Sequence, residues 1–334
     1  MTEPAPIRIT FEEINDARSG SGLERLFASY WPAYRRWIGR APSCETARAI
    51  GALRDHMPEL MPVFESLLER FGGGDPVARF LTLFEPPPLV RGCSQIVLPT
   101  DEGPVLLRNY DHHPDLFDGV ILDAAWGGVG TLAMTDCMWG ALDGINEQGL
   151  VVALAFGGRH AVGSGFAAPL IVRYLLQTCS DTGQARDALA RVPVSMPYTF
   201  VVVDADARFF TAFLGPDREP VFVTRRCSAN HQGETEWPAY ARQTRSRERL
   251  GVMESLLAGK PGVETDAARR AFLRPPLWRH DHASASGTLY SAEYHPGERS
   301  LSLRWPGQST RVLLGRTKDR TCPVELPPPP AAED

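Results

Sequence analysis

The sequence predicts an α+β protein in which helices and antiparallel sheets occupy separate stretches of the chain. Apolar residues recur at steps of three and four over the first ninety residues, which is the spacing of amphipathic helices. From Cys93 onward, short runs rich in β-branched and aromatic residues follow one another in blocks joined by turn residues. Because strands and helices do not alternate regularly, a doubly wound parallel sheet is disfavoured.

The first ninety residues are expected to form three helices followed by a proline-rich connector. Pro58 and Pro62 should kink or divide the second helix, and the Gly72-Gly73-Gly74 run should end it. Glu85-Pro86-Pro87-Pro88 cannot be helical and indicates an extended connector. The expected helices cover residues 23–37, 43–71 and 76–84.

Beyond the connector, the sequence predicts a hairpin over residues 93–111, with Gly103 in its turn. Asp181 is expected to cap a helix. Further strands are expected at 120–126, 131–135, 139–145, 150–156, 199–203, 209–213, 221–224, 288–294 and 300–305, and further helices at 169–178, 181–190 and 238–257. The resulting organisation is a helical N-terminal segment (1–92), a catalytic domain (93–320) and a proline-rich tail (321–334).

Composition excludes several classes of function. The 334 residues carry a net charge of −5, which gives no electrostatic case for nucleic-acid binding. No apolar run has the length of a membrane span, and the N-terminus lacks the apolar core of a secretory signal. Six cysteines without a C-x-x-C pair favour neither a disulfide framework nor a zinc ribbon. We therefore expect a soluble cytoplasmic protein that could form a homo-oligomer, with reduced cysteines and no membrane partner.

The Gly92-Cys93 dipeptide is the strongest candidate for a chemically reactive site in the sequence. It follows the connector, at the change from helices to strands, so that cleavage there would leave Cys93 at a rigid strand end. If the chain turns at residues 101–103, Arg108 and Asp111 return to the start of the first strand. A guanidinium and a carboxylate would then approach the thiol.

Four motifs in order carry a family resemblance: Gly92-Cys93-Ser94, Arg108-Asn109-Tyr110-Asp111, the stretch from Asp143 to Leu150 (DGINEQGL) and Ala229-Asn230-His231. Together they resemble the N-terminal-nucleophile (Ntn) hydrolases of the isopenicillin N acyltransferase type. Penicillin V acylases, bile salt hydrolases and acid ceramidases are more distant relatives. The likeness runs from Cys93 to about Arg247 and, more weakly, through the last hairpin. It implies an αββα four-layer sandwich with two antiparallel sheets.

The resemblance implies a self-processing cysteine hydrolase or acyltransferase made as a zymogen. Cleavage between Gly92 and Cys93 would free an α-amine with a pKa of about 7.7–8.0, on the same residue as a thiol with a pKa of about 8.5. The amine can take the thiol proton, so no catalytic histidine is required. Cys93 would attack a linear amide or a thioester and form an acyl-thioester intermediate, with acyl-coenzyme A as one possible substrate. The cleaved N-terminal chain would stay bound as a partner.

The resemblance implies roles for three further residues and makes Arg247 a candidate for a fourth. Asp111 would anchor the amine, Arg108 would favour the thiolate, and Asn230 would donate to the oxyanion. Ala229 stands where the family has Thr, and Ala155 stands where the bile salt hydrolases have a second oxyanion donor. Ser246-Arg247 matches a family S-R pair, but Arg245, Arg247 and Arg249 equally fit the solvated face of a helix.

Tyr110, His231 and Phe156 are the candidate substrate-binding residues, and no metal or organic cofactor is expected. Two alternatives stay open. The first is a catalytically silent Ntn-fold binding module. The second is a metal-dependent hydrolase that uses His112-His113 or His280-Asp281-His282. Adjacent histidines on a strand point to opposite faces, and neither set has an evident third ligand.

Overall fold

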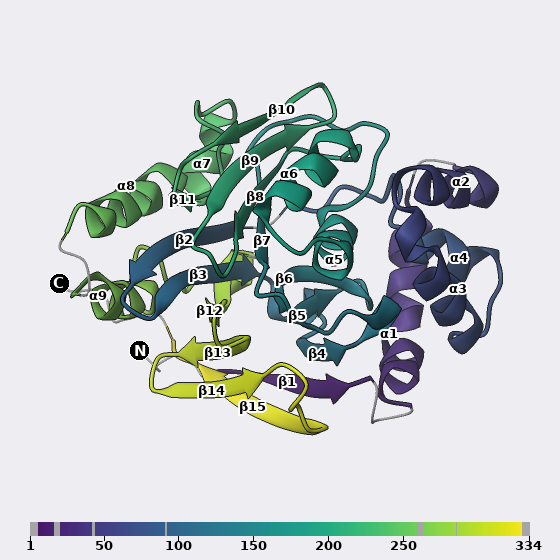
Figure 1. The fold of residues 1–334 in the computed structure, drawn as a ribbon, viewed down its shortest axis with the longest axis horizontal. Coiled ribbons are helices and arrows are strands. Elements are labelled where there is room, and N and C mark those ends of the chain that lie inside the picture. The colour runs from purple at the N-terminus through teal and green to yellow at the C-terminus, as the bar shows by residue number, and fades with distance from the viewer. Residues whose placement is uncertain are drawn as a thin grey trace.

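The chain forms two β-sheets between helices in a computed structural model that describes residues 6–16, 21–41, 44–90, 92–259, 263–284 and 286–328 (Figure 1). The larger sheet has nine strands in the order β10-β9-β8-β7-β6-β5-β4-β1-β15. These are β1 (Ile7–Asn15), β4 (Val120–Ala124), β5 (Thr131–Asp136), β6 (Gly140–Asn146), β7 (Val151–Phe156), β8 (Tyr198–Val203), β9 (Phe209–Gly215), β10 (Arg218–Val223) and β15 (Arg320–Leu326). The smaller sheet has the order β11-β2-β3-β12-β13-β14. Its strands are β2 (Gly92–Thr100), β3 (Gly103–His112), β11 (Cys227–Ser228), β12 (Gly287–His295), β13 (Ser300–Trp305) and β14 (Gln308–Leu313).

Helices cover the outer faces of both sheets. The α-helices are α1 (Gly22–Ile38), α2 (Thr46–His56), α3 (Met61–Arg70), α4 (Asp75–Leu81), α5 (Ala168–Thr178), α6 (Thr182–Arg191), α7 (Pro238–Gln243), α8 (Ser246–Leu257) and α9 (Val263–Phe272). Helices α5 and α6 pack on the nine-stranded sheet, and α8 and α9 pack on the six-stranded one. One apolar core lies between the two sheets and another lies beneath each helical layer. The α+β class and the four-layer arrangement are confirmed.

Helices α1 to α4 gather at one end of the molecule (Figure 1). The expected helix over 23–37 is confirmed as α1, and Pro58 does divide the second stretch, because it begins a short 3₁₀ turn between α2 and α3. Pro62 lies in the first turn of α3, where its missing N–H costs no hydrogen bond. Gly72, Gly73 and Gly74 all have positive φ and end the helix as expected.

The N-terminal segment is not entirely helical, contrary to the expectation from sequence. Ile7–Asn15 forms β1, which pairs antiparallel with β15 and parallel with β4. The larger sheet is therefore mixed rather than fully antiparallel. Because Ile7, Ile9 and Phe11 alternate with polar residues, a strand signal was present over this stretch.

The C-terminal tail also departs from expectation, since Arg320–Leu326 forms strand β15 within the sheet. Residues 329–334 of the expected tail lie outside the described residues. The expected helix over 238–257 is two helices, because Arg245 adopts a left-handed φ of 50° between α7 and α8. Helix α9 was not expected from the sequence. The Asp181 cap is confirmed, with its carboxylate accepting from the Gln184 N–H at 3.0 Å.

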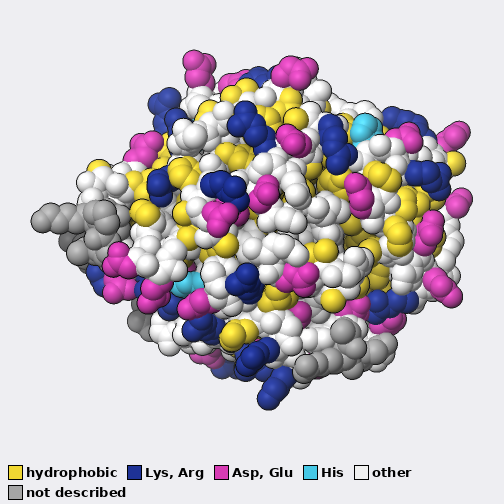
Figure 2. Space-filling view, in the orientation of Figure 1, with side chains coloured by type: hydrophobic (Ala, Val, Ile, Leu, Met, Phe, Trp, Pro, Cys, Tyr) yellow, Lys and Arg dark blue, Asp and Glu magenta, His cyan; other side chains and the backbone are white. Residues whose placement is uncertain are grey.

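Charged side chains of both signs are interspersed over the visible face, with apolar ones scattered between them (Figure 2). In the part of the chain that the structure describes, no helix combines the length and the apolar character needed to span a bilayer. Within the same ranges, no three His, Cys, Asp or Glu side chains lie close enough to hold a metal ion.

The buried Glu293 on β12 gives the fold a predicted acid sensitivity. Burial alone would raise the pKa of Glu293, but hydrogen bonds from His295 and Arg269 and the charge of Arg304 lower it to about 2. A lowered carboxyl pKa stabilises the fold above the ordinary value of 4.5, and this stabilisation is lost as the pH falls towards 2. We expect Glu293→Gln to lower the free energy of unfolding by about 3 kcal/mol at pH 7.

Urea unfolding of wild type and Glu293→Gln between pH 3 and pH 7 measures this difference. The difference in unfolding free energy should begin to shrink below about pH 4.5, where the wild-type carboxylate starts to lose its advantage. A difference that stays constant over this range would contradict the assignment.

Candidate active site

The β2–β3 hairpin places the two halves of the expected site opposite each other. Gly92 pairs with Asp111, Cys93 with Tyr110 and Gln95 with Arg108. The strands turn where expected, and Gly103 has a φ of 110° that other residues rarely adopt. The local register thus brings the carboxylate of β3 to the Gly92–Cys93 peptide bond, as the sequence predicted.

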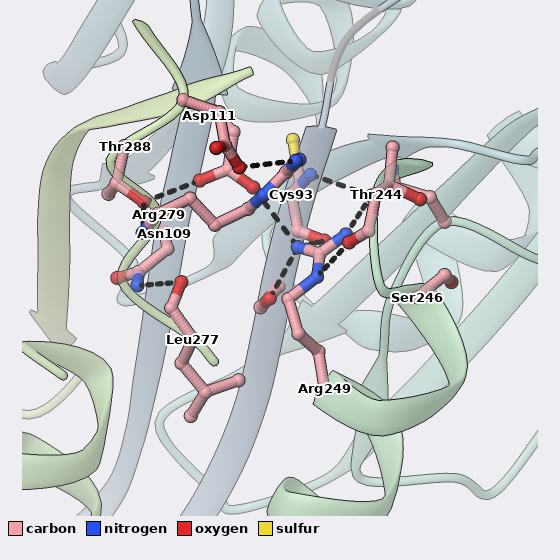
Figure 3. Close-up of polar contacts among 12 residues, drawn as sticks. Cys93, Asn109, Asp111, Thr244, Ser246, Arg249, Leu277, Arg279 and Thr288 are labelled. Atoms are coloured by element: carbon pink, nitrogen blue, oxygen red, sulfur yellow. Dashed lines mark hydrogen bonds and ion pairs between the residues drawn. The ribbon is translucent and has the colours of Figure 1, made fainter. Parts of the chain in front are cut away.

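Cys93 is fully buried and is held by contacts on three of its atoms (Figure 3). Its backbone N–H donates to Asn230 Oδ1 at 3.0 Å, and its carbonyl oxygen accepts from Arg249 Nη1 at 2.9 Å. Its Sγ accepts from Arg108 Nη2 at 3.3 Å. Burial raises the pKa of the Cys93 thiol, the charge of Arg108 lowers it and the charge of Asp111 raises it. The Cys93 thiol is therefore enclosed by the protein and protonated at neutral pH.

Arg249 is a site residue that was not selected from the sequence. Its guanidinium contacts Asp111 Oδ2 at 3.1 Å and Asn230 Oδ1 at 2.6 Å, and it also donates to Ser94 Oγ at 2.7 Å. Asp111 Oδ1 accepts from Thr288 Oγ1 at 2.7 Å, so both carboxylate oxygens are bonded. Figure 3 shows Arg249 rising from its helix towards Cys93 and Asp111.

Arg247, the arginine selected from sequence, is not brought to Cys93. It lies on the exposed side of α8, where its Nε donates to Thr235 Oγ1 at 2.9 Å. Ser246, Arg249 and Met253 form the buried stripe of this helix. Their spacing of three and four is the periodic signal that could have identified Arg249.

Arg108 is anchored by a buried polar cluster made of Asp143, Tyr290 and Tyr294. Its Nη1 forms an ion pair with Asp143 and donates to the Tyr290 hydroxyl at 3.0 Å. The hydroxyls of Tyr290 and Tyr294 donate to the two oxygens of Asp143 at 2.7 and 2.5 Å. Burial and then the charge of Asp143 hold the pKa of both tyrosines well above the usual range. The cluster therefore fixes the guanidinium that contacts the thiol.

Both polar atoms of the Asn230 side chain form hydrogen bonds. Its Oδ1 accepts from Cys93 and Arg249, and its Nδ2 donates to the Phe156 carbonyl at 3.2 Å. The side chain of Asn230 thus holds the nitrogen of the Gly92–Cys93 peptide bond. Donation from Nδ2 to an oxyanion, as expected from sequence, stays a prediction for the cleaved enzyme.

The three candidate substrate-binding residues are buried near these groups. Tyr110 lies opposite Cys93 on β3, and Phe156 ends β7 beside Asn230. His231 Nδ1 lies 2.6 Å from Ser246 Oγ, and burial, followed by the charge of Arg225, lowers the pKa of its imidazole. A substrate contact for any of them stays a prediction.

Gly92 fits this site because it has no side chain. A Cβ at this position would lie 2.9 Å from both Cβ and Oδ2 of Asp111, closer than real Cβ atoms approach. Any other residue would push the carboxylate away from the Gly92–Cys93 bond.

The chain was compared with curated sequences, with solved structures and with models of protein families. A search of curated protein sequences found no match. Among solved structures, the penicillin V acylase of Agrobacterium tumefaciens is similar, with 12% identity, a TM-score of 0.47 and coverage of 67% of this chain and 86% of that one. A mutant of the conjugated bile acid hydrolase of Clostridium perfringens has 10% identity, a TM-score of 0.48 and coverage of 70% and 96%. An N-acylethanolamine-hydrolyzing acid amidase ortholog of Caenorhabditis elegans has 16% identity, a TM-score of 0.45 and coverage of 61% and 93%.

The sequence itself matches the profile of one protein family over residues 98–310, a stretch that begins shortly after Cys93 and contains Arg108, Asp111, Asn230 and Arg249. This match covers more than half of the chain. The chain therefore belongs to the acyl-coenzyme A:6-aminopenicillanic acid acyl-transferase family.

Proposed function

We propose that the protein cuts its own chain between Gly92 and Cys93 and then uses Cys93 to hydrolyse or transfer acyl groups from amides or thioesters. The observation that carries this proposal is the arrangement around one peptide bond. Asn230 holds the nitrogen of that bond, Arg249 holds the Cys93 carbonyl, and Arg108 contacts the thiol. Polar groups that surround a fully buried peptide bond are explained if that bond takes part in a reaction.

In self-cleavage, Sγ of Cys93 attacks the Gly92 carbonyl, and the C–N bond breaks as the nitrogen takes up a proton. Water then hydrolyses the resulting thioester, releasing the Gly92 carboxylate and regenerating the thiol. The product carries a free α-amine beside the thiol. In turnover, this amine accepts the thiol proton and later protonates the leaving amine. Asp111, bonded to Arg249 and Thr288, lies where it can orient the amine.

The N-terminal chain is expected to remain bound after cleavage. It supplies β1 to the large sheet, and α1 to α4 bury apolar side chains in the core beneath it. We also propose a cytoplasmic location, because six cysteines without a C-x-x-C pair do not favour a disulfide framework.

Intact mass under denaturing, reducing conditions tests the proposal. Wild type should give two chains of roughly 10 and 27 kDa, since the chain would divide after Gly92. Cys93→Ala should stay intact, while Cys179→Ala, a buried cysteine outside the site, should be cut like wild type. Cleaved wild type should then release amine from simple acyl amides. A folded wild-type chain that remains whole and inactive would favour a silent binding module instead.

A further inference from the structure

Arg279 is a buried arginine beside the candidate active site, and two of its hydrogen-bond donors are unused. Its side chain is only 3% exposed. The Nη2 group donates to the Gln243 carbonyl at 2.8 Å and to Asp281 Oδ2 at 3.0 Å. Nε and Nη1 are buried as well, and neither has a hydrogen-bond partner in the part of the chain that the structure describes. Because unpartnered donors on a buried charge are costly, they point to a ligand that accepts from them.

The backbone of Arg279 is joined to the site through Thr288. The Arg279 N–H donates to Thr288 Oγ1 at 2.8 Å, and the Thr288 N–H donates to the Arg279 carbonyl at 2.8 Å. Thr288 Oγ1 in turn donates to Asp111 Oδ1 at 2.7 Å. Asp111 packs so closely on Gly92 that a Cβ there would lie 2.9 Å from its Oδ2. A continuous chain of contacts therefore links Arg279 to the Gly92–Cys93 bond.

The side chain of Arg279 extends across the site towards Arg249 (Figure 3). Burial lowers the pKa of Arg249, Asp111 raises it, and the charge of Arg279 lowers it again. Arg249 donates to the Cys93 carbonyl at 2.9 Å. The charge of Arg279 therefore acts on a group that touches the residue after the bond.

Arg279 lacks the buried carboxylate partner that Arg249 has. Arg249 contacts Asp111 at 3.1 Å, and both of these side chains are fully buried. Arg279 pairs instead with Asp281, whose side chain is 57% exposed, so water screens much of this interaction. Arg279 can thus balance one further negative group inside the site.

Self-cleavage would create a negative group of this kind next to Arg279. Hydrolysis of the thioester releases Gly92 as a C-terminal carboxylate. A carboxylate in a buried site needs a positive partner and hydrogen-bond donors, and Nε and Nη1 of Arg279 supply both. Residues 86–90, which precede the new chain end, form no hydrogen bond with the described part of the chain. Few bonds therefore need to break for this end to move.

We propose that Arg279 binds the carboxylate that self-cleavage creates at Gly92 and holds the new end of the N-terminal chain away from the Cys93 thiol. This inference rests on the proposed function. The ligand is a part of this chain that exists only after the cut, which explains why two buried donors wait without a partner before it. With the carboxylate held by Arg279, the thiol and the new α-amine of Cys93 are left open to substrate.

Trimming of the cleaved protein by carboxypeptidase Y, followed by intact mass of the N-terminal chain, tests this inference. A chain end held in a buried site cannot enter the peptidase, so folded wild type should resist trimming that proceeds quickly in urea. Arg279→Met should be trimmed roughly tenfold faster than wild type or more, because a charged hydrogen-bond partner is lost. Arg279→Gln should also be trimmed faster, which covers a methionine variant that fails to fold. Arg279→Lys keeps the charge and should restore part of the protection.

Arg242→Met removes an exposed arginine of α7 and should resist trimming like wild type. Wild type that is trimmed as fast when folded as in urea, or equal trimming of wild type and the Arg279 variants, would overturn the inference, while the cut itself still supports the proposed function. If Arg279 binds a carboxylate of the substrate instead, wild type is trimmed freely and Arg279→Met raises KM for N-acyl amino acids but not for their amides, which also overturns it. If the wild-type chain stays whole, both proposals fall.

Discussion

Replacing Arg249 by methionine should abolish self-cleavage over hours and lower amide turnover at least a hundredfold. The side chain joins four partners around the reacting bond, including the Cys93 carbonyl, Asp111 and Asn230. Burial lowers the pKa of Arg249, and Asp111 partly restores it, so the pair is mutually dependent. Removing one partner of a buried ion pair costs about 3–5 kcal/mol, because the other charge is left unpaired.

The time course of chain cleavage, followed by mass from the moment of refolding, measures this effect. Arg249→Met combined with Asp111→Asn should recover thermal stability without recovering cleavage, which separates folding from chemistry. Arg247→Met should be cut at the wild-type rate, because its guanidinium contacts Thr235 on the exposed side of the helix. A cleaved Arg249→Met, or an uncleaved but folded Arg247→Met, would contradict the conclusion that Arg249, and not Arg247, is needed for self-cleavage.

Asp143→Asn should lower kcat by about a hundredfold and shift the reactivity of Cys93 to higher pH. The carboxylate accepts from Arg108, Tyr290 and Tyr294, and a neutral amide would present an N–H to one of these donors. Arg108 would lose its anchor and move from the thiol. Arg108 lowers the pKa of Cys93 more than Asp143 raises it, so the net result is a higher thiol pKa.

Alkylation of Cys93 by iodoacetamide across pH 6–10, in cleaved protein, reports this shift directly. Asp206→Asn, an exposed aspartate, is the matched control and should leave the profile unchanged. Tyr290→Phe removes one donor to Asp143 while keeping the ring, and a smaller shift in the same direction is expected. An unchanged alkylation profile in Asp143→Asn would limit this residue to a structural role.

Features that depend on residues close together in the chain were predicted correctly from the sequence. The hairpin register that brings Asp111 to Gly92 follows from two short strands and a glycine turn. The helix breaks at Pro58 and at the three glycines from residue 72 are equally local. Strand β1 was missed although its alternating pattern was present, because its partners β15 and β4 lie far along the chain.

The amino-acid sequence by itself predicted that Gly92, Cys93 and the β3 side chains of Arg108 and Asp111 lie together, because a hairpin is a short-range structure. Only the tertiary structure decided which arginine of α8 enters the site. The left-handed turn at Arg245 sets the rotation of that helix and directs Arg249 inward. The Asp143 cluster likewise joins strands of both sheets. Such contacts depend on how the layers pack, which no local pattern of residues encodes.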